Sequence, residues 1–152
     1  MVLIDTNSLL LLVLGSIDPR IINSHSRTSI YEEEDFFTLV NLVENNLAKI
    51  LVLPNVWPAV DNPLNRFKGE RKWGYIQNFK ILTSHTLEKY FPSSLGANNF
   101  YFLELGLTDV LLLECAKDCE LLITSDSKLS DIAKANGIKV IDLVENRNKR
   151  MK

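Results

Sequence analysis

The chain opens with Val2-Leu3-Ile4-Asp5-Thr6-Asn7, and a similar pattern returns near its end as Leu121-Leu122-Ile123-Thr124-Ser125-Asp126. In both stretches three apolar residues lead to polar residues that include an aspartate. A short apolar run with a polar end is typical of a buried parallel strand that reaches the edge of a sheet. Two strands of one sheet are therefore expected near the two ends of the chain.

Helix and strand patterns alternate between these two stretches. Further strands are expected at residues 50–53 and 138–141, where short apolar runs stand beside turn residues. Helices are expected from about residue 8 and over residues 36–48, 55–67, 72–82, 109–116 and 127–135, with Pro63 kinking or breaking one of them. Strands that alternate with helices predict an α/β fold with a mainly parallel central sheet flanked by helices.

Length and composition place the chain among ordinary folded domains. Its 152 residues suit one domain, and 46% hydrophobic with 24% charged residues argue against a disordered or fibrous chain. The formal net charge is only −2, so nucleic acid would have to bind through a local basic patch.

The cysteines and the apolar runs exclude other classes of protein. Cys115 and Cys119 lack a second pair to complete a four-ligand zinc site, so they are expected to be reduced core thiols of a cytoplasmic protein. The apolar run at residues 2–14 contains Asp5 and has no basic start, which is unlike a signal peptide. No stretch approaches the about 20 apolar residues of a membrane span, so no membrane insertion is expected.

Three aspartates are candidates for a metal site. Asp5 and Asp126 each follow a strand, and ligands of parallel sheets bind beyond the carboxyl ends of the strands. Asp109 stands in the first turn of a helix that Thr108 is expected to cap. Carboxylates at one sheet edge repel each other unless they take up protons or hold a cation, and Mg²⁺ or Mn²⁺ prefers such oxygen ligands. The alternative is that each aspartate is only a turn or cap residue.

These motifs, in this order, resemble the PIN-domain nuclease family. Residues 2–7 are similar to the family's opening strand with its first metal-binding aspartate. Leu107-Thr108-Asp109 resembles the motif that supplies another acid at a helix start, and residues 122–126 resemble the closing strand with the last acid. With Gly137-Ile138-Lys139-Val140 the resemblance covers nearly the whole chain, as a PIN-like domain over residues 1–143 and a basic C-terminal tail over residues 144–152.

The resemblance implies a metal-dependent endoribonuclease that cuts single-stranded or structured RNA. Asp5, Asp109 and Asp126 are then both metal ligands and catalytic residues. Asn7 and Thr124 match polar positions that support the acids through hydrogen bonds, although capping of the following turns explains them equally well. Such nucleases are often toxins of bacterial toxin–antitoxin pairs and often homodimers, so an antitoxin protein and a second copy are expected partners.

One position departs from the family's pattern. The family usually has a Glu in a segment like Pro-x-Val-x-x-Glu-Val, and here Pro54-Asn55-Val56-Trp57-Pro58-Ala59-Val60 places Ala59 at that position. A methyl group cannot bind metal, and Asp61 is about 200° further round a helix. Asn62 is on roughly the same face and could hold a metal-bound water. The chain is therefore expected to have impaired activity, whether the change is natural, engineered or compensated by another acid.

A basic and aromatic cluster is the candidate for RNA binding. The cluster consists of Arg66, Lys68, Arg71, Lys72 and Trp73, and the tail adds Arg147, Lys149, Arg150 and Lys152. Such residues could hold phosphate, with Trp73 stacking on a base, although a solvated helix face and a frayed charged terminus are the simpler interpretations. Two rival functions stay open: a PIN-like module that binds RNA or protein without cutting, and a phosphotransfer protein phosphorylated on a strand-end aspartate. The second rival lacks an aspartate at position 7, where many such phosphatases have one.

Overall fold

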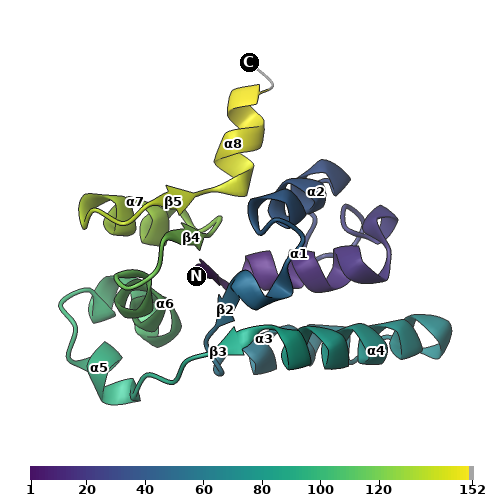
Figure 1. Ribbon diagram of the computed structural model, residues 1–152, viewed down its shortest axis with the longest axis horizontal. Helices are drawn as coiled ribbons and strands as arrows, with labels where there is room; N and C mark the ends of the chain where they lie inside the picture. Colours follow the sequence, from purple (N-terminus) through teal and green to yellow (C-terminus); the bar gives the residue numbers. More distant parts are fainter. Residues whose placement is uncertain (151–152) are drawn as a thin grey trace.

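Five short parallel strands lie at the centre of the computed structural model, which describes residues 1–150, the last without its side chain (Figure 1). Their bounds are Val2–Ile4 (β1), Ile50–Val52 (β2), Leu87–Glu88 (β3), Leu121–Ile123 (β4) and Val140–Ile141 (β5). The spatial order is β3-β2-β1-β4-β5, and every pairing is parallel. The opening strand β1 is therefore the middle of the sheet, between β2 and β4.

Helices flank this sheet on both sides. The α-helices within residues 1–150 are Thr6–Ile17 (α1), Glu33–Leu42 (α2), Val56–Leu64 (α3), Gly69–His85 (α4), Ser93–Ala97 (α5), Phe102–Ala116 (α6), Ser127–Ala135 (α7) and Leu143–Arg150 (α8), with short 3-10 helices at Pro19–Ile21 (η1) and Leu47–Lys49 (η2). α1 to α4 gather on one side of the strands and α5 to α7 on the other (Figure 1). None of these helices is both long and apolar enough to cross a bilayer. The expected α/β fold, one domain with a parallel sheet between helices, is confirmed.

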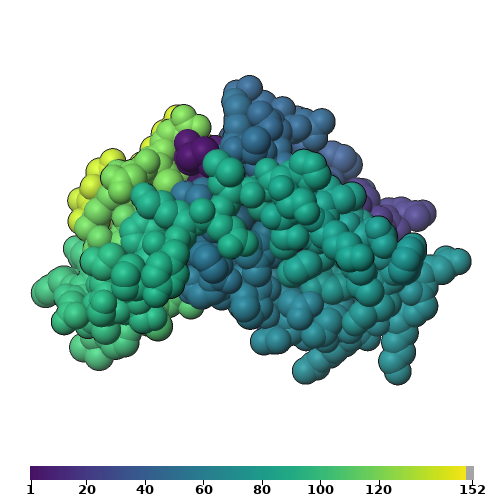
Figure 2. Space-filling view, turned by 60° about the horizontal axis from the view of Figure 1, so that its bottom comes forward, coloured from purple at the N-terminus to yellow at the C-terminus, as the bar shows by residue number. Residues whose placement is uncertain are grey.

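Two groups of helices can be distinguished on the surface of the molecule. The α3–α4 hairpin and the α5–α6 segment form two projections with a notch between them (Figure 2). The chain between α4 and α5 crosses from one projection to the other and includes the edge strand β3. The sheet thus carries two helical groups that extend in different directions from its edges.

The core follows from elements that are apolar along their whole length. Every residue of β1, β2 and β4 is buried, as expected for parallel strands covered on both faces. The run from Leu9 to Leu14 in α1 is also buried. Gly15 follows this run, and a side chain there would overlap the ring of Phe36 in α2. The close packing of α1 on α2 therefore depends on glycine at position 15.

Some element bounds differ from those expected. α2 ends at Leu42 rather than at residue 48, because Glu44 and Asn45 have φ angles of 55° and 51°, outside the right-handed helical region. β3 consists of two exposed residues, so no apolar run predicted it. α3 runs through Pro63 without a break and ends at Leu64, three residues before the end expected for it.

The segment expected to be a basic tail, residues 144–152, is helical as far as the structure describes it. Helix α8 packs against α2, and Arg147 Nη1 lies 3.0 Å from Oδ2 of the buried Asp35. The same nitrogen donates a hydrogen bond to the Ile30 carbonyl at 2.7 Å. Buried polar contacts therefore attach this segment to the domain. Residues 151 and 152 lie outside the described residues.

Candidate metal centre

Asp5, at the end of β1, is the most enclosed of the three predicted ligands, with 4% of its surface exposed. Its Oδ1 accepts a hydrogen bond from the Ser8 amide at 2.8 Å, and its Oδ2 accepts one from Thr124 Oγ1 at 2.5 Å. The Ser8 contact makes Asp5 the N-cap of α1, where the helix dipole favours a negative charge. These two hydrogen bonds hold the carboxylate in one orientation.

Thr124 connects Asp5 to the second strand-end acid, Asp126. Thr124 Oγ1 donates to Asp5 and accepts a hydrogen bond from the Asp126 amide at 3.1 Å. Asp126 in turn caps α7, because its Oδ1 accepts from the Leu129 amide at 2.9 Å. Thr124 therefore makes the contact expected of it, whereas the side chain of Asn7 makes no hydrogen bond within residues 1–150.

Asp109 approaches the same edge from α6. Gly106 interrupts this helix with φ 78° and ψ 172°, a conformation open to glycine, so the regular part begins before Thr108. The expected cap at Thr108 is therefore wrong. Thr108 Oγ1 instead accepts a hydrogen bond from Asn55 Nδ2 at 3.5 Å. The half-buried carboxylate of Asp109 has no hydrogen bond to any residue that the structure describes.

The three acids act on one another electrostatically. Burial raises the pKa of Asp5 above its usual range, although hydrogen bonds from Thr124 and Ser8 oppose this effect. Burial raises the pKa of Asp109 to about 6, and repulsion from Asp126 and Asp5 contributes to this rise. Asp5, Asp109 and Asp126 thus lie together at the carboxyl edge of the sheet, and we call them the acidic edge.

The oxygens of the acidic edge differ in their availability. Both oxygens of Asp5 accept hydrogen bonds, whereas Asp126 Oδ2 and both oxygens of Asp109 accept none from residues 1–150. In that same range, no three His, Cys, Asp or Glu side chains are grouped closely enough to hold a metal ion by themselves. Mg²⁺ is commonly held by one or two carboxylates, with waters and substrate phosphate completing its shell. The donor set fits such an ion, because it offers hard oxygen ligands and uncompensated negative charge.

Position 59, where the family pattern has a Glu, lies on α3 near the same edge. Asn55, one turn before Ala59, contacts Thr108, the neighbour of Asp109. Residues four apart share a helix face, and helical side chains point toward the N-terminus. A longer side chain at position 59 would therefore extend toward Thr108 and the acidic edge.

The polar residues after Ala59 do not replace the missing acid. The carboxylate of Asp61 accepts hydrogen bonds from Tyr75 Oη in α4 and from Asn65 Nδ2 at the end of α3. Asn62 is exposed and lines a hollow together with His25. Neither side chain has a hydrogen bond to the acidic edge.

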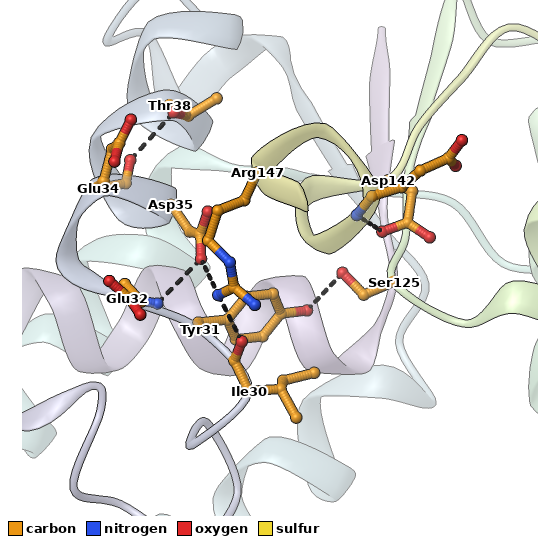
Figure 3. Close-up of polar contacts among 10 residues, drawn as sticks. Ile30, Tyr31, Glu32, Glu34, Asp35, Thr38, Ser125, Asp142 and Arg147 are labelled. Atoms are coloured by element: carbon orange, nitrogen blue, oxygen red, sulfur yellow. Dashed lines mark hydrogen bonds and ion pairs between the residues drawn. The ribbon is translucent and has the colours of Figure 1, made fainter. Parts of the chain in front are cut away.

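Tyr31 also belongs to this region, although the sequence did not single it out. Its side chain is fully buried, and its hydroxyl donates a hydrogen bond to Ser125 Oγ at 2.8 Å (Figure 3). Burial raises the pKa of Tyr31, and the negative charges of Asp5 and Asp142 act in the same direction. The hydroxyl therefore stays a neutral hydrogen-bond donor beside the acids. Tyr31 precedes α2 in a loop without periodicity, so no sequence signal marked it.

Asp142 is a fourth acid that follows a strand, in this case β5. It is largely buried, and its Oδ1 accepts a hydrogen bond from the Glu145 amide at 3.0 Å, which caps α8 (Figure 3). An apolar run followed by an aspartate was the signal used for Asp5, and it was present here too. Asp142 could have been predicted by the same rule.

The three residues predicted to contact substrate do not act as one group. Arg71 lies over the ring of Phe67, 5.8 Å from its centroid, and Lys72 Nζ donates to a carbonyl of the preceding loop. Trp73 is 66% exposed. Of the three, Arg71 lines a hollow, together with Arg66.

A comparison of the chain with protein-family models and with curated proteins finds no match. The resemblance to PIN-domain nucleases therefore rests on the motifs themselves and on where the fold places them. The chemistry of the acidic edge is the basis on which a function can be proposed.

Proposed function

We propose that this chain is an endoribonuclease of PIN type that uses Mg²⁺ or Mn²⁺ to hydrolyse RNA. The observation that carries the proposal is the placement of Asp5 and Asp126 after neighbouring parallel strands, where Thr124 Oγ1 bridges them and Asp109 lies near enough to be repelled by both. Such repulsion disfavours the folded state unless protons or a cation offset it. A cluster of this kind beyond the carboxyl ends of parallel strands supports a cation site.

The acids have different parts in this proposal. Asp109 and Asp126 offer oxygens that no described residue uses, and Asp5 offers its remaining lone pairs from a fixed orientation. Thr124 fixes the positions of Asp5 and Asp126 relative to each other through its two hydrogen bonds. A bound ion would lower the pKa of a water and neutralise charge on the phosphate being cut.

Ala59 limits the proposed activity. With one carboxylate fewer than the family pattern, the chain should bind metal weakly and cut RNA slowly. The same absence favours a second candidate, a PIN-like module that binds RNA or a protein without cutting. The antitoxin partner and the homodimer belong to the first proposal and rest on the resemblance alone, whereas the cytoplasmic location rests on the expected reduced state of Cys115 and Cys119.

The test restores the missing acid. Ala59→Glu should tighten Mn²⁺ binding, measured by titration calorimetry, and should raise the rate of RNA cleavage. Residues that merely support a metal site change affinity by about 10- to 100-fold, so a direct ligand should give at least a tenfold effect. Ala59→Gln is the matched control, because it has nearly the same size without the charge.

Pro58 precedes the substituted position and restricts the backbone there. The Pro58→Thr, Ala59→Glu pair is therefore measured alongside the single variant, so that a misdirected side chain is distinguished from a wrong assignment. If neither variant binds Mn²⁺ more tightly or cuts RNA faster than the parent, position 59 does not face the acids. The binding module would then be the better account of the chain.

A further inference from the structure

A second charged region lies at the far end of α3 from Asn55. A hollow of about 400 Å³ opens there, and it is lined by His25, Ser26, Arg27, Asn62, Pro63, Arg66 and Phe67. A neighbouring hollow shares Arg66 and Phe67 and continues to Arg71. We call His25, Arg27, Arg66 and Arg71 the cationic pocket.

The arginines of the cationic pocket, Arg27, Arg66 and Arg71, have no ion-pair partner among the residues that the structure describes. Two acids, Asp18 and Glu70, line the neighbouring hollow, and Asp18 is already paired with Arg20 at 3.0 Å. Arg27 lines the first hollow, Arg71 lines the second and Arg66 lines both, so three guanidinium groups without an ion pair border two adjoining hollows, and the charge of Asp18 acts on Arg71.

Packing gives the cationic pocket a defined shape. The ring of Phe67 is the centre of it, with His25 edge-on at 5.7 Å between ring centroids and Arg71 over its face at 5.8 Å. The loop that carries His25 and Arg27 is fixed by a buried hydrogen bond from Thr28 Oγ1 to the Ile22 carbonyl at 2.6 Å. Groups placed in advance lose less conformational entropy when a ligand binds.

The positive charges of the cationic pocket affect the protonation of His25. The Arg27 amide donates a hydrogen bond to His25 Nδ1 at 3.1 Å, which requires that nitrogen to be unprotonated. Burial lowers the pKa of His25, and the charges of Arg27 and Arg71 lower it further. An anion bound between these groups would offset the two charges and favour the protonated imidazole.

We propose that the cationic pocket binds the phosphate backbone of single-stranded RNA, which rests on the proposed nuclease function and names where its substrate is held. Guanidinium groups match the geometry of phosphate oxygens, and positively charged grooves beside aromatic rings are typical of proteins that bind single-stranded nucleic acid. Two segments lead from the pocket to the acidic edge: α3, whose last residue Leu64 is about 8 Å beyond Ala59 along the helix axis, and the loop from His25 to Tyr31. An RNA strand bound in the cationic pocket would therefore extend along α3 toward the acidic edge.

The binding experiment is carried out in chelator, so that it does not depend on cleavage. Fluorescence anisotropy of a labelled single-stranded RNA of mixed sequence is measured with the parent chain and with Arg27→Ala, Arg66→Ala and Arg71→Ala. Each substitution should weaken binding about five- to tenfold and should reduce the salt dependence of the binding constant by about 0.7 in its logarithmic slope. Lys139→Ala removes an exposed cation next to β5, outside the pocket, and is the matched control.

A second measurement follows His25 directly. The chain has two histidines, so nuclear magnetic resonance resolves His25 with His85 as an internal reference. Addition of the same RNA should raise the pKa of His25 and leave the His85 resonance in place. Because bound phosphate favours the charged imidazole, affinity should increase as the pH falls through the His25 transition.

The outcomes separate this proposal from the nuclease function. Equal RNA affinity in the parent and all three arginine variants overturns the pocket, even if Ala59→Glu cuts RNA. Weakened binding in the variants, without cleavage by any form of the chain, supports the pocket and overturns the nuclease. Absence of RNA binding, or tighter binding of an acidic peptide such as polyglutamate at the same sites, overturns the pocket as an RNA site.

Discussion

The acidic edge and the cationic pocket are both clusters of like charge, but the fold holds them in different environments. Asp5 is buried and fixed by two hydrogen bonds at the end of the central strand, and Asp109 is half-buried beside it. Arg27 and Arg66 are exposed on a loop and just after a helix. Water and salt screen charges at the surface but screen buried charges much less.

This difference separates two ways of preparing a site for a charged ligand. In the acidic edge, burial and, to a smaller extent, repulsion from Asp126 and Asp5 raise the pKa of Asp109 to about 6, and such an environment favours a compact cation. The charges of the cationic pocket are exposed to solvent, and this arrangement suits an extended polyanion. Substitutions in the two regions should therefore change stability by different amounts and respond differently to salt.

The largest effect is expected at Thr124, which holds the acidic edge together. Thr124→Val removes the donor to Asp5 and the acceptor of the Asp126 amide while keeping the shape of the side chain. A hydrogen bond to a charged group contributes about 1.5–3 kcal/mol, so the free energy of unfolding in urea should fall by about 2–3 kcal/mol. Thr124→Ser keeps the hydroxyl and should lose clearly less. A valine variant as stable as the parent would show that the acids need no such support.

The next effect concerns the charge of Asp109. Its pKa of about 6 in the folded chain lies above the ordinary value of 3.8, so between these values the folded protein binds a proton that the unfolded chain does not. The stability that this group contributes is therefore fully present below pH 3.8 and is lost as the pH rises through 6.

Asp109→Asn should abolish that loss. In chelator at pH 7 the variant should be more stable than the parent by about 1–2 kcal/mol, after allowance for partial exposure of the group, and the two should converge near pH 4. Thermal unfolding across this pH range measures the difference, which corresponds to a few degrees in Tm. A variant less stable than the parent at pH 7 would mean that Asp109 is a structural residue.

A smaller effect distinguishes the charge of Asp126 from its cap. Asparagine caps helices as well as aspartate does, so Asp126→Asn should keep the contact with the Leu129 amide and raise Tm in chelator by relieving repulsion. Asp126→Ala loses the cap as well and should be about 1 kcal/mol less stable than the asparagine variant. A lower Tm for Asp126→Asn than for the parent, without metal, would contradict the electrostatic interpretation.

The acidic edge was more predictable from sequence than the cationic pocket, and the reason is local. β1, β4 and α7 were predicted because an apolar run that ends in a capping aspartate marks both the strand and the helix after it. Parallel pairing of Ile4 with Ile123 then brings the two acids together. Asp109 could be predicted at the same edge because it lies in the helix that leads into β4.

Contacts between distant segments without periodicity could not be predicted. The cationic pocket joins the loop around His25 to the turn around Phe67, and no pattern in either segment identifies the other. Arg147 belongs to the segment expected to be a basic tail, yet its partner Asp35 lies 112 residues earlier. Packing of whole elements decides such contacts, and single-segment patterns do not contain that information.

The smallest effect on stability is expected for substitutions in the cationic pocket. The dependence of this effect on salt distinguishes the cationic pocket from the acidic edge. Arg66 is exposed and unpaired, so Arg66→Ala should change the free energy of unfolding by no more than about 0.5 kcal/mol. Any gain in stability should come from reduced repulsion with Arg27 and Arg71, and should disappear at 1 M salt, where screening acts within about 3 Å. The gain from Asp109→Asn should persist at that salt concentration, because the acids are partly removed from solvent. Urea unfolding of both variants in chelator, at low and at high salt, measures this difference. If the two gains disappear together, the acidic edge is as well solvated as the pocket, and repulsion within it no longer supports a cation site.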